Sequence, residues 1–200
     1  MQQIPDDYHF NGCYGMSMLE RTVEGTECII LGDARNACVQ YEEALERMPY
    51  AHTMYVNNAG RRAPGDIPQM VATMHGGKKD FIGTQRMPVE RMHDALLIVQ
   101  NCSNWEHERA DLIYHGWSTG GTSGLFAALS AVYLGFERVL MAGCDITHYR
   151  YCSSGVLQTW RNWAPLLCQR VQSLGGHTKE ILEEAAYEFQ RSTTGATDCS

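Results

Sequence analysis

The sequence lacks several features that mark large classes of protein. Its longest apolar stretch is interrupted by Gly135, Glu137 and Arg138, so no segment is expected to cross a membrane. Pro5 and the two aspartates after it interrupt the start of the chain, which argues against a secretory signal peptide. The eight cysteines contain no C-x-x-C pair, so their spacing indicates neither a common zinc site nor a redox motif. We therefore expect a cytoplasmic protein with reduced cysteines.

An excess of basic residues is also missing. The chain has 16 lysines and arginines against 23 aspartates and glutamates, which gives a formal net charge of −7. General nucleic-acid binding is therefore not expected, because proteins of that class normally carry a basic surface. The exception is the segment Arg61–Arg91, where six basic residues stand against three acidic ones. This segment fits either a phosphate-bearing ligand or a solvated loop region.

Length and composition fit one domain. The 200 residues are 44% hydrophobic, which is enough for a single core without disulfides or metals. We predict a single domain over residues 1–200, with a core at about 28–182, an irregular N-terminal arm at 1–24 and a loose tail at 191–200. The chain contains no internal repeat and no linker, and its sequence indicates no particular oligomeric state.

The stretch Ser118–Thr147 has the clearest pattern. Its apolar residues recur at helical spacing, which predicts a helix with a wide apolar face. Gly135 is a typical helix end, because glycine readily takes positive φ. Val139–Ala142 then fits a strand buried on both faces. The residues that recur at helical spacing are Leu125, Leu129 and Val132.

Strands and helices alternate along much of the remaining chain. Buried strands are predicted at 28–31, 53–56, 69–74, 96–99, 111–114 and 170–174. Helices are predicted at 38–48, 156–167 and 178–184, the last with Thr178 as its N-cap. This alternation favours an α/β fold, a Rossmann-like three-layer sandwich with a mostly parallel central sheet.

Three places in this pattern could contact a ligand. In open α/β sheets, ligands bind beyond the carboxyl ends of the strands, near helix N-termini. The glycine-rich loop at 120–124 precedes a helix, where free N–H groups favour an anion, although Thr122 or Ser123 could simply cap that helix. Asn57 and Asn58 follow a strand and could bind a base, a ribose or a sugar, or else form a turn.

The third place is the turn that begins at Gly32, between the first predicted strand and the helix that Asn36 could cap. Strand, glycine turn and helix together form the entry to a nucleotide-binding fold. The turn lacks the G-x-G-x-x-G pattern, so an NAD site of the Rossmann kind is not expected.

Three segments resemble a known group of proteins: ILGDARN from Ile30, VNNAG from Val56, and TSGLFAALSAVYLGFERVLMAGCDI from Thr122. The group is Rossmann-like and contains the 6-hydroxymethylpterin diphosphokinase-like domains, the flagellin-glycosylation accessory proteins and the bacterial family 42 sialyltransferases. The chain looks most like phage-encoded members of this group. The resemblance covers roughly residues 28–182 at low identity, and its most specific part is the helix start with the strand end that follows.

The resemblance implies ligand contacts at the ends of the first two strands. Gly32 matches the first glycine of a turn that lies against the nucleotide. Asp33 and the residues after it replace the rest of that turn, which puts phosphate contact there in doubt. Asn57 and Asn58 match a strand-end asparagine position near the nucleotide.

The resemblance also implies roles for the central stretch. Thr122, Ser123 and Gly124 match the helix start that holds the nucleotide or the donor sugar. Gly143 and Asp145 match the end of a strand whose carboxylate faces the ligand. From the residues alone, a second interpretation is that Asp145 merely caps a turn.

The expected function is that of a nucleotide-dependent transferase, most like a glycosyltransferase that uses a nucleotide-activated sugar. The sialyltransferases of the group use a later histidine as general base, for which His148 and His177 are candidates. We assign Asp145 and His148 as catalytic residues, because an imidazole with a pKa near neutrality suits removal of a proton from a sugar hydroxyl.

Two alternatives stay open. One is transfer of a diphosphoryl group from ATP, as in the pterin diphosphokinases, which would involve Mg²⁺ at Asp145. The other is a non-catalytic nucleotide-binding or phage accessory protein, because fold does not fix function. In each case the expected partner is a small nucleotide, and the expected location is the cytoplasm, that of the host if the chain is phage-encoded.

Overall fold

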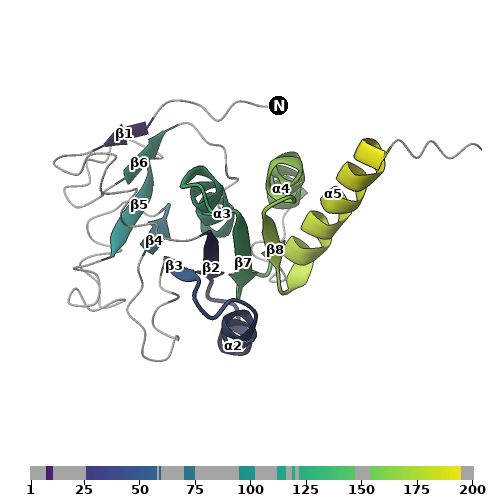
Figure 1. Ribbon diagram of the computed structural model, residues 1–200. Coiled ribbons are helices and arrows are strands. Elements are labelled where there is room, and N and C mark those ends of the chain that lie inside the picture. The colour runs from purple at the N-terminus through teal and green to yellow at the C-terminus, as the bar shows by residue number, and fades with distance from the viewer. Residues whose placement is uncertain are drawn as a thin grey trace, which may run out of the picture.

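A computed structural model describes residues 8–10, 26–57, 59, 70–74, 95–101, 112–115, 119, 122–146 and 154–194 (Figure 1). Its strands are β1 (Tyr8–Phe10), β2 (Glu27–Leu31), β3 (His52–Val56), β4 (Met70–Thr73), β5 (Leu96–Asn101), β6 (Leu112–His115), β7 (Arg138–Ala142) and β8 (Val171–Ser173). Its helices are α2 (Ala37–Arg47), α3 (Ser123–Tyr133), α4 (Ser154–Leu167) and α5 (Gly176–Thr194).

The strands form one sheet in the order β1-β6-β5-β4-β3-β2-β7-β8. Neighbours from β6 to β8 pair in parallel, and β1 pairs antiparallel with β6 at one edge. Ile30 of β2 lies opposite Met54 of β3 on one side and Met141 of β7 on the other. The predicted α/β fold with a mostly parallel sheet is therefore confirmed.

Helices cover both faces of this sheet, as Figure 1 shows. On one face, α2 packs against Ile29, Leu31 and Leu140. On the other face, α3 and α4 pack against Ile30 and Met141. Successive side chains of a strand point to opposite faces, so the same strands supply both cores. The result is the three-layer sandwich that the alternating sequence pattern predicted.

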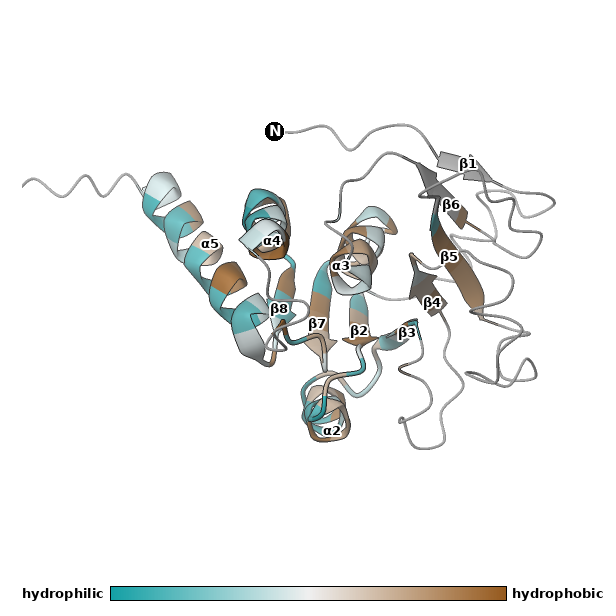
Figure 2. Ribbon diagram, turned by 180° about the vertical axis from the view of Figure 1, so that it is seen from behind, coloured by the Kyte–Doolittle hydropathy of each residue, from teal (hydrophilic) through white to brown (hydrophobic). Residues whose placement is uncertain are grey.

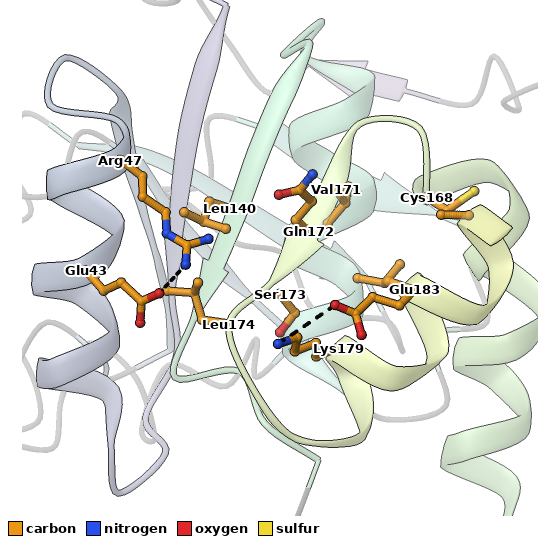
Figure 3. A pocket seen from close by; sticks show the side chains of 12 residues that line it. Glu43, Arg47, Leu140, Cys168, Val171, Gln172, Ser173, Leu174, Lys179 and Glu183 are labelled. Atoms are coloured by element: carbon orange, nitrogen blue, oxygen red, sulfur yellow. Dashed lines mark hydrogen bonds and ion pairs between the residues drawn. The ribbon is translucent and has the colours of Figure 1, made fainter. Parts of the chain in front are cut away.

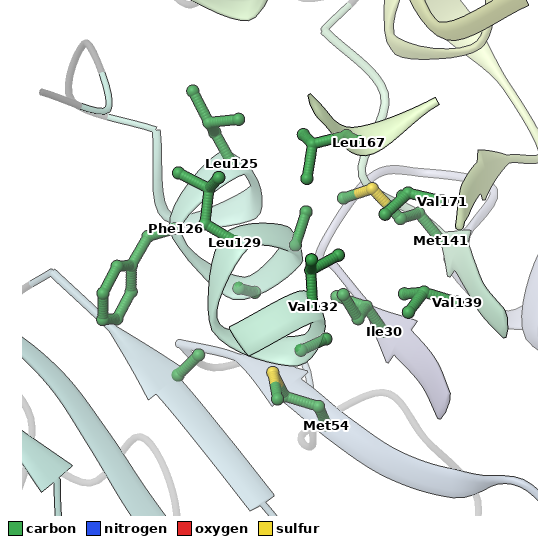
Figure 4. Packing of buried hydrophobic residues seen from close by; sticks show 14 of the residues in the cluster. Ile30, Met54, Leu125, Phe126, Leu129, Val132, Val139, Met141, Leu167 and Val171 are labelled. Carbon is green, nitrogen blue, oxygen red and sulfur yellow. The ribbon is translucent and has the colours of Figure 1, made fainter. Parts of the chain in front are cut away.

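Helix α3 lies at the centre of the larger core. All its residues from Leu125 to Val132 are buried, as expected for a helix that is apolar nearly all round (Figure 4). Gly135 ends the helical segment as predicted, with φ at +96°, and the Phe136 amide donates back to the Ala131 carbonyl. This packing fixes where α3 begins relative to the strand ends.

The chain leaves the two central strands toward opposite faces of the sheet. After β2 it enters α2 on one face, whereas after β7 it enters α4 on the other. The carboxyl ends of β2 and β7 therefore form the point at which the strand order reverses. Ligands of open α/β sheets bind at such points.

Near the ends of the chain, the described residues differ from the prediction in two places. Residues 8–10 fall within the N-terminal arm expected to be irregular, yet they form β1 against β6. The last helix runs from Gly176 to Thr194, whereas the sequence predicted 178–184 and a loose tail from 191. The helix continues because good helix formers follow Glu184 and no glycine or proline intervenes before Gly195.

Helix α5 is two-sided, with hydrophobic and hydrophilic residues on different flanks in Figure 2. Its buried residues are Thr178, Ile181, Leu182 and Ala185. Thr178 lies inside the helix and does not cap it, because its hydroxyl donates to the Cys144 carbonyl at 2.9 Å. No helix in the described part of the chain is both long and apolar enough to cross a membrane.

Replacing Phe126 by alanine tests the central place of α3. Phe126 is fully buried, so its loss leaves a cavity and should lower the free energy of unfolding by about 3–5 kcal/mol. Tyr133→Ala in the same helix is the control, because Tyr133 is 38% exposed and its loss should cost only about 1 kcal/mol. Urea unfolding measures both, and equal losses would contradict this packing.

Candidate functional site

The turns after β2 and β7 contact each other at the carboxyl edge of the sheet. The Gly32 amide donates to the Ala142 carbonyl at 2.8 Å, and the Ala34 amide donates to the Gly143 carbonyl at 3.0 Å. These bonds extend the pairing of β2 and β7 by one residue. They bring Gly32 and Gly143, two residues predicted for the site, into direct contact.

Both glycines are required by this contact. A Cβ on Gly32 would overlap the carbonyl oxygen of Gly143. Gly143 has φ at +63°, and a Cβ there would lie 2.5 Å from the Cβ of Ala37 in α2. The two glycines thus allow the β2 turn, the β7 turn and α2 to approach closely.

Asp145 is held to α2 by two amide side chains. Its Oδ2 accepts hydrogen bonds from Asn36 Nδ2 at 3.0 Å and from Gln40 Nε2 at 3.5 Å. The Oε1 of Gln40, which is 7% exposed, accepts from the Gly143 amide at 2.6 Å. Gln40 therefore fixes both the turn after β7 and the carboxylate that follows it. Asn36 stands at the predicted N-cap position of α2, but its side chain makes no cap bond there and bonds to Asp145 instead.

The other oxygen of Asp145 faces the start of α5. Oδ1 is buried and has no hydrogen-bond partner among the described residues. A Cβ on Gly175, the residue before α5, would lie 2.8 Å and 2.9 Å from the two carboxylate oxygens. The absence of a side chain at Gly175 therefore makes room for the carboxylate. A helix N-terminus favours a negative charge at this position.

Cys144 lies between Gly143 and Asp145. Burial raises the pKa of its thiol far above the usual range, and the neighbouring charge of Asp145 raises it further. The thiol therefore stays protonated and unreactive near neutral pH. Cys144 is partly buried and packs against the larger core at this edge.

Helix α3 begins without a side-chain cap. Thr122 precedes it with φ at −107° and makes no cap bond, because its hydroxyl donates to the Thr119 carbonyl at 3.0 Å. The first helical bond runs from the Phe126 amide to the Thr122 carbonyl. Within the described residues, the amides of Ser123, Gly124 and Leu125 thus have no acceptor, and neither does the Ser123 hydroxyl. Such a helix start can bind an anion.

The start of α3 lies beside the end of β7. A Cβ on Gly124 would lie 3.9 Å from the Cβ of Cys144 and 3.9 Å from Cζ2 of Trp160. Just before the helix, the hydroxyl of Thr119 donates to Oε1 of Gln100 in β5 at 2.9 Å. The helix start is therefore anchored to strand ends on both of its sides. The structure brings Ser123 and Gly124 to the same edge as Gly143.

Asn57 forms a turn at the end of β3 and still keeps a free donor. Its φ is +52°, and its backbone amide donates to the Ala72 carbonyl at 3.0 Å. Its side-chain Oδ1 accepts from the Thr73 hydroxyl at 2.8 Å. This bond leaves Nδ2 without an acceptor among the described residues. Asn57 is therefore a turn residue, as one interpretation held, that can also donate to a ligand.

Three further predictions need separate mention. Asp33 is exposed in the turn between β2 and α2. Asn58 and His148 lie outside the described residues, and so do the basic residues of Arg61–Arg91. Their roles stay predictions.

The sequence did not identify Gln40 and Gly175 as residues of the site, and it did not predict where His177 lies relative to the site. Gln40 falls on the buried face of α2 with Ala37, Tyr41 and Ala44, so a polar residue on an apolar face was the available signal. His177 lies in the first turn of α5, where its Nδ1 is 2.7 Å from Oε2 of Glu180. No local pattern marks Gly175, because its contact with Asp145 joins distant segments.

Comparisons with protein-family models, with curated proteins and with solved structures find no match to this chain. What the site can bind therefore rests on its own geometry. Within the described ranges, no three His, Cys, Asp or Glu side chains gather closely enough to hold a metal ion.

Alanine at Gly32 tests the close approach of the two turns. The new Cβ would overlap a backbone oxygen that cannot rotate away, so we expect a loss of at least about 3 kcal/mol of stability. Gly135→Ala is the control, because Gly135 has positive φ but open space around its Cβ position, so only backbone strain opposes the change. That change should cost only about 1–2 kcal/mol of backbone strain. Similar losses in urea unfolding would show that the turns do not touch.

Leucine at Gln40 tests the bridge between Gly143 and Asp145. The substitution keeps the size of the side chain but leaves the buried Gly143 amide unpaired and removes a donor from Asp145. We expect a loss of about 1–3 kcal/mol in the free energy of unfolding. Gln158→Leu on the exposed side of α4 should change stability by less than about 0.5 kcal/mol. A stable Gln40→Leu variant would refute the bridge.

Proposed function

We propose that this chain is a nucleotide-dependent transferase, and that its substrate is a nucleotide-activated sugar bound at the carboxyl edge of the sheet. The observation that carries the proposal is the uncapped start of α3 beside the point where the strand order reverses. A helix start at such a point combines free N–H donors with the place where α/β sheets bind ligands.

The phosphate of the donor would bind at the start of α3. Among the described residues, the amides of Ser123, Gly124 and Leu125 have no acceptor, and the Ser123 hydroxyl adds a side-chain donor. The positive end of the helix dipole favours the negative charge of the phosphate. Hydrogen bonds to a charged oxygen are stronger than those between neutral groups.

Asn57 would bind the nucleoside part. Thr73 donates to Oδ1 and thereby fixes the amide so that Nδ2, which has no acceptor among the described residues, offers the ligand two N–H donors. Asn57 would therefore bind an oxygen or ring nitrogen that accepts hydrogen bonds, such as those of a ribose or a base. Thr73 acts as a positioning residue that sets this orientation.

Asp145 would act mainly as a positioning residue. Oδ2 already accepts two amide hydrogen bonds, and Oδ1 is buried next to Gly175. The carboxylate fixes Asn36 and Gln40, and through Gln40 it fixes the turn at Gly143. Replacing Asp145 would therefore disturb the site indirectly, through Asn36, Gln40 and the turn at Gly143.

Transfer requires a base near the acceptor hydroxyl. An oxygen of the acceptor attacks the anomeric carbon of the donor, the bond from that carbon to the phosphate oxygen breaks, and the electron pair leaves with the nucleotide. The proton of the acceptor passes to the base. His148 is the residue predicted for this step, and His177 is a second candidate, because Glu180 can hold its Nδ1 and leave Nε2 to take the proton.

For the other two functions, the described residues weigh against diphosphoryl transfer and give some support to binding without turnover. Diphosphoryl transfer from ATP needs Mg²⁺, but the bonds to Asn36 and Gln40 occupy Oδ2 of Asp145. The described residues do not form a cage for the metal, which would have to arrive bound to ATP. Nucleotide binding without turnover is supported by the turn at Gly32, which packs on β7 and forms no open glycine-rich loop.

A thermal-shift screen with CMP, CDP, UDP, GDP and ATP, each with and without Mg²⁺, tests the proposal. We expect selective stabilisation by one nucleotide class. Ser123→Ala should weaken its binding about 10- to 100-fold, because it removes a hydrogen bond to a charged oxygen. The stability of the ligand-free protein should change little, since the Ser123 hydroxyl has no described partner.

Ser130→Ala is the matched control in the same helix, because its buried hydroxyl also lacks a partner among the described residues. It should leave nucleotide binding unchanged. Asp145→Asn should lower both stability and turnover. Stabilisation by ATP only with Mg²⁺ would support the diphosphokinase alternative, and binding without product would support the non-catalytic one. No stabilisation by any nucleotide would overturn the proposal.

A further inference from the structure

A groove of about 270 Å³ lies between α2 and α5, on the face of the sheet that carries α2 (Figure 3). Leu140 of β7, Gln172 of β8 and Leu174 after β8 line it between the two helices. On this face α2 packs on β2 and β7, so the surface of β8 between α2 and α5 stays open. On the opposite face, the same part of the sheet is covered by α4 and α5.

Each wall of the groove carries one acid and one base. On α2 they are Glu43 and Arg47, which form an ion pair one turn apart. On α5 they are Lys179 and Glu183, which form another at 3.8 Å. All four side chains keep between 44% and 68% of their surface exposed, so these internal pairs leave the charges available to a second molecule.

The order of the charges is opposite on the two walls. Both helices start near strand carboxyl ends, and α5 runs at an angle to α2, as Figures 1 and 3 show. Counted from the start of each helix, the acid comes first on α2, whereas the base comes first on α5. A wall of α2 is therefore complementary in charge to a wall of α5.

This reversed order is what a symmetric dimer requires. A two-fold axis that bisects the directions of α2 and α5, lying between two facing molecules, places α2 of one copy along α5 of the other. Glu43 then meets the partner's Lys179, and Arg47 meets the partner's Glu183. The symmetry makes the same contacts a second time, so the surface is complementary to itself.

An exposed apolar residue extends the α2 wall. Val39 precedes Glu43 by one turn on the same stripe of the helix and is 68% exposed. Contact with a second molecule would bury this side chain together with the floor of the groove.

We propose that two copies of this chain pack face to face over the groove between α2 and α5, and that the pairs of Glu43 with the partner's Lys179 and of Arg47 with the partner's Glu183 set their register. The occupant is a second copy because the groove carries both charges on both walls in reversed order. A partner of a single charge would be attracted by one end of each wall and repelled by the other.

Sedimentation of the full chain over a range of concentrations tests this proposal. We expect a monomer–dimer equilibrium that weakens when ionic strength rises from ~0.1 M to ~1 M, because the Debye length falls from ~10 Å to ~3 Å. Glu43→Lys and Lys179→Glu should each weaken the dimer about tenfold or more, since each turns two attractive contacts into repulsive ones. The double variant should regain an affinity within about threefold of the wild type, because it restores both contacts with the charges exchanged.

Glu188→Lys, on an exposed part of α5 outside the groove, should leave dimerisation unchanged. Circular dichroism checks that each variant is folded. If Glu43→Lys does not fold, the exchange of Arg47→Glu with Glu183→Arg tests the second pair in the same way. A wild-type monomer at every concentration, or a double variant as weak as its single parents, would overturn the proposal. None of these measurements needs a nucleotide, so the outcome is independent of the proposed function.

Discussion

The contact between the turns after β2 and β7 is the constraint on which the rest of the structure depends. Neither Gly32 nor Gly143 has room for a Cβ, because at Gly32 it would overlap the Gly143 carbonyl and at Gly143 it would overlap Ala37 of α2. Two central strands can diverge toward opposite helix layers only if their ends stay paired, and the two hydrogen bonds here keep them paired. The buried side chain of Gln40 then links α2 to the Gly143 amide. The two turns and α2 therefore have little freedom to move relative to one another.

This constraint also decides which polar groups remain for a ligand. The glycines and Asp145 are used largely within the protein, since their neighbours are one another, α2 and the start of α5. Among the described residues, the groups left over are donors: the first amides of α3, the Ser123 hydroxyl and Nδ2 of Asn57. An edge rich in free donors suits a ligand rich in acceptors, and a nucleotide phosphate is such a ligand. In the proposed transferase, the nucleotide would therefore be bound by the start of α3 and the end of β3 more than by the turn at Gly32.

The two helix layers are unequal near β8, and this inequality underlies the proposed dimer. Helices α4 and α5 cover one face of the outer strands, whereas α2 leaves part of the other face open. A second copy would complete the missing part of the layer. Its binding would be independent of the carboxyl edge, because the groove residues named in the charge pairs do not contribute donors to the nucleotide site.

Much of the fold follows from the sequence itself. The periodic spacing of apolar residues and the glycine turns between segments predicted β2, β3, β7, α2 and α3, because both are local features of the sequence. Local patterns also predicted Ser123 and Asn57, since a residue before a helix or after a strand can be recognised from its neighbours. The roles of Asp145, Gln40 and Gly175 could not be found in this way. Their contacts join segments 30 to 109 residues apart, and only the tertiary fold brings these segments together. The same holds for β1 and for the reversed charges on α2 and α5, which the sequence contains but cannot place side by side.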